Sequence, residues 1–304
     1  MEWKPARGKK LWYFNDAKRR RPQRADGGAG PLAHINLVRM DRLNFSAGRI
    51  SFLRAFAMAC AALCLMGEGG TREPAPYLHV PLSRDQLIRN FDVIVFHNEF
   101  DGQTDSRLRK WVAPVRLYLD IRSGDRKLIE FAVEQHVEHL AGITQYDIAV
   151  VKDPAQANVV VVFDNESALD RIRRDYFPPK FDIKQVMQTN LCIGQYQSNE
   201  SYEIVHAVVV IPVDRVMAAG RLEACVVEEI TQILGLPNDS DDVNPSVFND
   251  DSAEIELTSQ DILLVKLLFD PRLRPGMRRA EVLANVREIL EEMGYRGDKR
   301  PGAN

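Results

Sequence analysis

Two adjacent carboxylates and a side-chain amide, Glu228, Glu229 and Gln232, lie within an otherwise apolar run from Cys225 to Leu236. At about 100° per residue, the apolar side chains of this run share one side of a helix. Glu228 and Gln232 share the opposite side, one turn apart, and Glu229 lies beside them. Carboxylate and amide oxygens bind hard cations, and adjacent carboxylates in a cleft can divide acid and base roles between them. The alternative is that these residues only solvate a structural helix.

The residues that follow the helix add oxygen donors to the same region. Gly235 is expected to end the helix, with Leu236 and Pro237 after it, as is common at a helix end that carries glycine. Asn238 and Asp239 come next and open an acidic loop. The oxygen atoms of Gln232 and Asn238 are weak ligands for zinc and are better suited to Ca²⁺ or Mg²⁺.

The flanking sequence predicts several strands and helices around this helix. Alternation and β-branched runs predict the strands, and apolar periodicity predicts the helices. We expect strands at 92–96, 111–121, 147–151, 158–163 and 203–211, and helices at 126–140, 262–269 and 279–293. In the first long helix, we expect Leu128, Phe131, Ala132 and Val137 to point inward.

The N-terminal third predicts export. Residues 1–39 are basic and are expected to be a tail, or sequence upstream of a true start at Met40. Residues 40–67 have arginines before an apolar run, Ala55 to Met66, that is too short to span a bilayer, which is typical of a signal peptide. An uncleaved membrane anchor and a buried helix are the alternatives. Residues 68–90 are expected to be a linker, 91–277 the folded domain, and 278–304 a C-terminal helix and tail.

Export changes what the cysteines imply. Cys192 and Cys225 would be the only two in a mature chain, and in an oxidising compartment we expect them to form a disulfide. Two separate buried thiols are the alternative. The net charge of −3 argues against a nucleic-acid partner for the whole chain. Any membrane contact is expected only through the N-terminal signal segment.

The order of elements and the helix motif resemble the zincin metallopeptidases, including the matrixin-like ones. Their zinc helix has the pattern His-Glu-x-x-His-x-x-Gly, and this chain has Glu-Glu-x-x-Gln-x-x-Gly at the same spacing. The resemblance extends to Trp111 to Leu119, to Ala155 to Phe163, and to Ser246 to Phe248, which stands where zincins have their Met-turn. It implies an α+β, zincin-like fold that has a mixed, twisted sheet, an active-site-type helix and a small helical C-terminal part.

A narrower resemblance covers roughly Asp92 to Met277. The stretch Cys225 to Asp239, with the block from Leu257 to Pro275, is similar to exported bacterial proteins of domain-of-unknown-function family 2927. That family itself carries the altered ligand positions.

By the zincin resemblance, Glu229 holds the general-base position, and Glu228 and Gln232 hold ligand positions. Asn238 or Asp239 lies near the third ligand. The resemblance also implies an edge strand that takes peptide by strand addition, and we expect that strand to be Glu203 to Ile211, with His206 near the cleft.

Four functions are compatible with this sequence. A cleft that binds a peptide or protein without catalysis is the interpretation we favour, because a neutral Gln does not replace imidazole at a tetrahedral zinc site. The alternatives are a peptidase-like hydrolase that uses Glu229 with an altered or non-zinc metal site, conventional zinc proteolysis, and a structural helix. The expected location is the periplasm or the exterior of the cell.

Overall fold

The computed structural model describes residues 2–5, 12–15, 82–97 and 107–295. Within the expected basic tail, strands β1 (Glu2–Pro5) and β2 (Trp12–Asn15) pair antiparallel as a separate two-stranded sheet. The predicted signal segment, residues 40–67, lies outside the described residues, and so does the linker up to residue 81.

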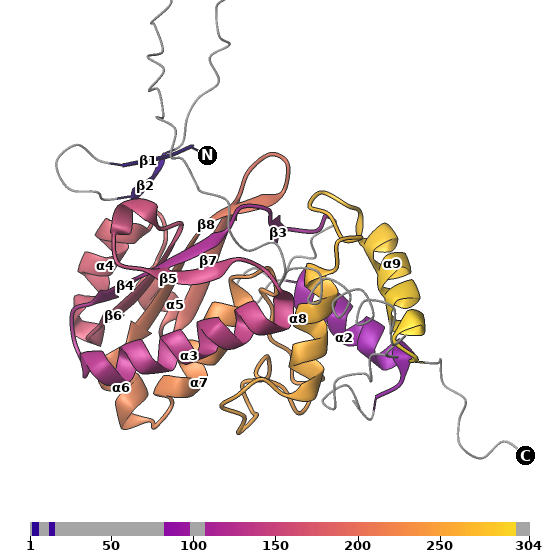
Figure 1. Cartoon of the computed structure of the whole chain (residues 1–304). Helices are drawn as coiled ribbons and strands as arrows, with labels where there is room; N and C mark the ends of the chain where they lie inside the picture. Colours follow the sequence, from indigo (N-terminus) through magenta and orange to yellow (C-terminus); the bar gives the residue numbers. More distant parts are fainter. Residues whose placement is uncertain (1, 6–11, 16–81, 98–106, 296–304) are drawn as a thin grey trace, which may run out of the picture. The chain divides into compact units, whose positions relative to one another are not determined.

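A six-stranded mixed sheet forms the centre of the domain (Figure 1). The strand order is β3-β8-β6-β4-β5, and β7 pairs with β8. Every pair is parallel except β7 with β8, which is antiparallel. This confirms the predicted mixed sheet of an α+β protein. The strands are β3 (Lys110–Trp111), β4 (Val115–Ile121), β5 (Ile148–Val151), β6 (Val159–Asp164), β7 (Ile193–Ser198) and β8 (Glu203–Pro212).

Helices cover both faces of this sheet because successive side chains of its inner strands point to opposite sides. In β6, Val159, Val161 and Phe163 enter one core with residues of α3 and α7. Val160 and Val162 enter a second core with residues of α4 and α5. The helices are α2 (Arg84–Phe96), α3 (Arg126–Thr144), α4 (Leu169–Tyr176), α5 (Ile183–Val186), α6 (Val213–Ala218), α7 (Leu222–Gln232), α8 (Ser259–Phe269) and α9 (Arg279–Glu292), with short 3-10 turns η1 (Pro154–Gln156) and η2 (Glu166–Ala168).

The predicted strand at 92–96 is wrong, because these residues form the second half of α2. Their apolar side chains continue a helical stripe, and Ser83 starts the helix with a capping box to Gln86. The four consecutive apolar residues at 93–96 also fit the pattern of a buried strand. The N-cap at Ser83 favours the helix instead. Among the residues that the structure describes, no helix is long and apolar enough to cross a membrane.

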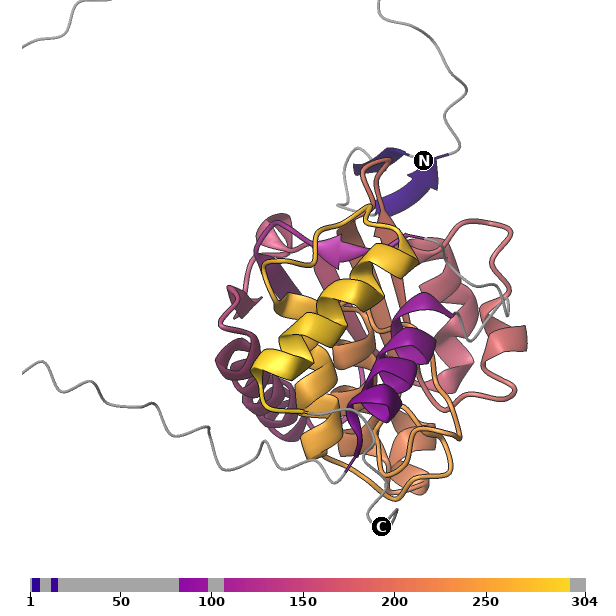
Figure 2. The same cartoon turned by 90° about the vertical axis from the view of Figure 1, so that its right-hand side faces the viewer.

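Helix α9 packs on α2, and Figure 2 shows the two side by side. Val282, Val286 and Leu290 bury its apolar stripe. Arg279 of α9 forms a bidentate ion pair with Asp92 of α2, with Nε 2.6 Å from Oδ1. The C-terminal helix therefore belongs to the folded core.

The inward face predicted for α3 is wrong at its first positions. Leu128 is 45% exposed and Phe131 is 63% exposed. The buried stripe instead runs through Ile129, Val133 and Val137, one residue round the helix from the predicted one, and of the predicted inward residues only Val137 is buried. Because apolar residues lie on both sides of the stripe, the sequence alone does not fix how α3 is rotated about its axis. Packing against β5 and α7 determines that rotation.

Candidate functional site

Helix α7 is buried along most of its length, although Glu223 is exposed and Glu228 is partly buried. It begins at Leu222, three residues before the predicted start, and ends at Gln232. The side chains of Glu229 and Gln232 are each only 4% exposed. Gly235 follows with φ of 120°, and a Cβ there would lie 2.8 Å from the carbonyl oxygen of Arg109. This close approach explains why the chain turns at a glycine.

The loop-facing side of α7 brings three carboxylates together. One oxygen each from Glu228, Asp239 and Asp250 lies within 4.8 Å of the others. Gln232 joins them by donating from Nε2 to Asp239 Oδ1 at 2.7 Å. Asn238 lies at the edge of this group, where its Nδ2 donates to the Asp239 carbonyl at 2.8 Å. The structure therefore brings Glu228, Gln232 and Asp239 together with Asp250, which the sequence did not indicate.

Asp250 reaches the cluster because the acidic loop folds back on itself. The Ser240 N–H donates to the Phe248 carbonyl, 2.8 Å away. Asp261 at the start of α8 fixes the same segment: its Oδ1 accepts from Ser246 Oγ at 2.5 Å, and its Oδ2 accepts from the Val247 N–H at 3.1 Å. Burial raises the pKa of Asp261 above its usual range.

The cluster consists of oxygen donors, which suit Ca²⁺, Mg²⁺ or Mn²⁺ better than Zn²⁺. Burial raises the pKa of Asp250, and the nearby carboxylates of Asp241 and Asp251 raise it further, so negative charge is crowded here. The residues do not fit the zinc ion that the zincin resemblance implies. No imidazole is present at either helix position, and Gln232 turns an N–H, which cannot coordinate a metal, toward Asp239.

Glu229 faces the sheet rather than the acidic cluster. A Cβ placed on Gly194 of β7 would lie 2.8 Å from Glu229 Oε2 and 3.1 Å from its carbonyl oxygen. The missing side chain at Gly194 therefore makes room for the Glu229 carboxylate between α7 and β7. The two adjacent carboxylates, Glu228 and Glu229, meet different surroundings.

We predict that Gly194→Ala lowers the free energy of unfolding by about 1–3 kcal/mol, because it overpacks this contact. Gly142→Ala on α3 is the matched control, since a Cβ there meets nothing within 4 Å. The control should gain up to about 1 kcal/mol from better helix propensity. Urea unfolding of both variants measures the difference, and equal effects would show that Gly194 does not set the α7–β7 distance.

The edge strand predicted from the sequence is wrong. Strand β8 lies inside the sheet, because Ala207 to Val210 pair with β6 on one side and with β7 on the other. The antiparallel strand β7 pairs with β8 and, within the described residues, with no other strand. His206 on β8 stands opposite Gln197 of β7, and burial lowers its pKa to about 4. The edge strand beside α7 is therefore β7.

The predicted disulfide between Cys192 and Cys225 is present, with a Cα–Cα distance of 6.0 Å. Cys192 immediately precedes β7, and Cys225 lies in the first turn of α7. The bond therefore ties the edge strand to the helix that carries the candidate site.

A buried histidine escaped the sequence analysis. His136 and His139 lie three residues apart on α3, and only His139 is exposed. His136 Nε2 lies 3.0 Å from Thr231 Oγ1 of α7. Burial lowers the pKa of His136 from 6.5 to about 3, and electrostatic repulsion by His139 acts in the same direction. The hidden signal was its place in the buried stripe of α3, seven residues after Ile129.

We predict a loss of stability in acid that arises from His136. In the unfolded chain the imidazole binds a proton below a pKa of 6.5, whereas in the folded chain it does so only near 3. The contribution of the neutral His136 to the free energy of unfolding is therefore fully present above about pH 6.5, and it is lost as the pH drops toward 3. Melting temperatures across this range should fall less steeply for His136→Gln, whose amide can still contact Thr231. Identical slopes would contradict the assignment.

The comparisons with known proteins identify a family without giving a function. A family model described as "protein of unknown function (DUF2927)" matches residues 84–288 of this chain. The chain belongs to that family, as its sequence resemblance suggested. The match begins at the first residue of α2 and extends into α9, so it includes α7 and the acidic loop that follows it. No curated protein matches the sequence.

Proposed function

We propose that this protein is an exported, zincin-like binding protein that holds an extended peptide or protein segment in a cleft beside α7 and does not carry out zinc proteolysis. The hydrogen bond from Gln232 Nε2 to Asp239 Oδ1 is the observation that carries the proposal. It joins two of the residues that would have to present lone pairs to a zinc ion. In the structure, the two side chains form a hydrogen bond with each other instead.

The zincin-like part of the proposal rests on the arrangement around α7. The helix keeps the Glu-Glu-x-x-Gln-x-x-Gly spacing, and a mostly parallel sheet precedes it in the chain. The loop after it returns to the helix at Asp239 and Asp250. This support is an analogy at the level of the fold, and it carries no activity with it.

Strand β7 is the surface that we propose for peptide binding. It is the one antiparallel strand of the main sheet, and its second edge is unpaired by any strand in the described part of the chain. An extended peptide added to this edge would gain main-chain hydrogen bonds, with side-chain pockets supplying specificity. The disulfide at Cys192 fixes the start of the strand and so reduces the ordering cost of binding.

A divalent cation at Glu228, Asp239 and Asp250 is compatible with this function. It would neutralise the crowded carboxylates and fix the acidic loop against α7. The same cluster favours the second candidate function, a peptidase-like hydrolase with a non-zinc metal site, because the buried carboxylate of Glu229 adjoins it in sequence. In that case Glu229 would take a proton from water, and Glu229→Gln would abolish hydrolysis without unfolding the protein.

Export is part of the proposal because it explains the disulfide. A bond between Cys192 and Cys225 is expected to persist in an oxidising compartment such as the periplasm or the cell exterior. The apolar run Ala55 to Met66 with its preceding arginines would direct the chain there.

Binding of unstructured peptides from a pooled library, followed by N-methylation of the peptides that bind, tests strand addition. We expect N-methylation at alternate residues to remove binding, because those N–H groups would donate to β7. Binding peptides should also be recovered intact. Release of cleavage products that depends on Glu229 would favour the hydrolase, and affinity that is insensitive to N-methylation would contradict strand addition.

A further inference from the structure

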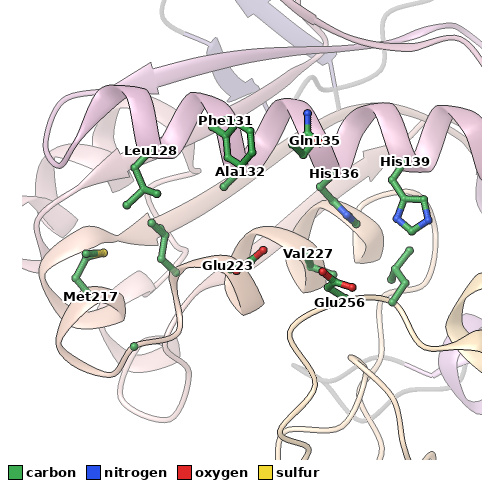
Figure 3. Close-up of a pocket in the computed structure, with 13 residues that line it drawn as sticks. Leu128, Phe131, Ala132, Gln135, His136, His139, Met217, Glu223, Val227 and Glu256 are labelled. Carbon is green, nitrogen blue, oxygen red and sulfur yellow. The ribbon is translucent and has the colours of Figure 1, made fainter.

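An apolar groove lies between α3 and the start of α7, away from the acidic cluster (Figure 3). Its volume is about 660 Å³. Leu128 and Phe131 of α3 and Met217 at the end of α6 line it, and Met217 is 51% exposed. Six large apolar side chains are exposed within the described residues, and these three are gathered at one place. Such clustering on a soluble protein indicates an interaction surface.

The charged side chains that line the groove are acidic. Glu223 of α7 and Glu256 of the loop before α8 both face it, and no lysine or arginine of the described part of the chain lines it. Neither carboxylate forms an ion pair with any residue that the structure describes. His139 completes the lining at the far end of α3. A bound partner would therefore gain by placing positive charge beside an apolar face.

The shape of the groove fits a helix. Its lining residues on α3 run from Leu128 to His139, which spans about 16 Å at 1.5 Å per residue, or roughly three helical turns. Apolar grooves along a helix are a recurring site for the apolar face of an amphipathic helix. The groove is also separate from the acidic cluster, because Glu223 and Val227 lie about 140° round α7 from Glu228 and Gln232.

We propose that this groove binds an amphipathic helix of a partner protein, with its apolar face against Leu128, Phe131 and Met217 and with lysine or arginine residues opposite Glu223 and Glu256. The site is independent of the cleft function proposed above. It would allow the protein to dock on another exported protein while β7 remains open to a peptide.

The test uses two labelled model helices about four turns long. One carries leucines at helical spacing flanked by lysines, and the other carries the same leucines flanked by glutamates. Fluorescence anisotropy against the full chain should show saturable binding of the lysine helix and at least tenfold weaker binding of the glutamate helix.

Variants locate the binding. Phe131→Ser and the pair Glu223→Gln with Glu256→Gln should each weaken binding of the lysine helix at least tenfold. Val112→Ser is the control, because Val112 is 54% exposed and lies outside the groove. All these side chains are at the surface, and thermal unfolding should show that each variant folds.

Three results would overturn the proposal. One is the absence of saturable binding by the lysine helix. Another is binding that Asp250→Asn removes and Phe131→Ser does not, which would place the helix on the acidic cluster. The third is a dimer of the unmodified chain in sedimentation that Phe131→Ser dissociates, which would show that a second copy of this protein covers the groove.

Discussion

A chain that carries both Glu228→His and Gln232→His is expected to bind zinc stoichiometrically, at least about 100-fold more tightly than the unmodified chain, or ~2.8 kcal/mol. The two imidazoles would stand one turn apart on the side of α7 that faces the acidic loop. Gln232 already lies 2.7 Å from Asp239 Oδ1, so a carboxylate is in reach as a third ligand. Three ligands with an open position make a catalytic type of zinc site.

Gln135→His supplies the matched control for this experiment. With the natural His139, it creates a pair of histidines at the same spacing on the exposed side of α3. That pair lacks the loop carboxylates, so we expect it to bind zinc much more weakly than the pair on α7. Titration with a chromophoric zinc chelator compares the two. Equal affinities would mean that the loop after α7 is not placed as a ligand-bearing loop, and the zincin-like part of the proposal would fail.

Removal of the disulfide by Cys192→Ser and Cys225→Ser is expected to cost about 3–4 kcal/mol of unfolding free energy. The bond closes a loop between residues 33 positions apart, and the chain-entropy model gives roughly this value for such a loop. Loss of the bond also releases the start of β7 from α7, so peptide binding at the edge strand should weaken with it.

Urea unfolding of the double variant measures this cost, and a reducing agent gives the control. The reductant should destabilise the unmodified chain by a similar amount and leave the double serine variant unchanged. A cost below about 1 kcal/mol would show that α7 and β7 hold their positions without the covalent bond. The disulfide would then indicate an oxidising compartment but would not stabilise the fold.

Short sequence patterns predicted the elements whose structure depends mainly on neighbouring residues. Strands 147–151 and 158–163 could be predicted because runs of β-branched residues favour strands. The end of α7 was recognisable because Gly235 supplies a backbone conformation that other residues avoid. The pairing of Cys192 with Cys225 followed from the expectation that they would be the only two cysteines of an exported, mature chain.

The errors arose where tertiary contacts decide between local alternatives. The stretch 92–96 fits a strand until the cap at Ser83 is taken into account. Leu128 and Phe131 were placed inward because the sequence cannot show that α3 leaves a groove open beside them. Asp250 joins the site only because the loop folds back and is held there by its own hydrogen bonds. In the sequence, Asp250 cannot be told apart from the nearby Asp241, Asp242 and Asp251.

The role of β7 also depended on the whole sheet. Strand β8 is the most strand-like run of the sequence, which made it the natural choice for a peptide-binding edge. A strand that is apolar on both faces belongs inside a sheet, and β8 is buried continuously from Ala207 to Pro212. The more polar strand, β7, takes the edge position, as edge strands commonly do.

The zinc content of the untagged, unmodified protein is the most direct test of the central claim. After equilibration with zinc and dialysis, elemental analysis should find far less than stoichiometric zinc, because Gln232 and Asp239 bond to each other and neither helix position carries an imidazole. One tightly held zinc ion per chain would contradict the claim, and it would make the acidic cluster of Glu228, Asp239 and Asp250 a candidate proteolytic centre.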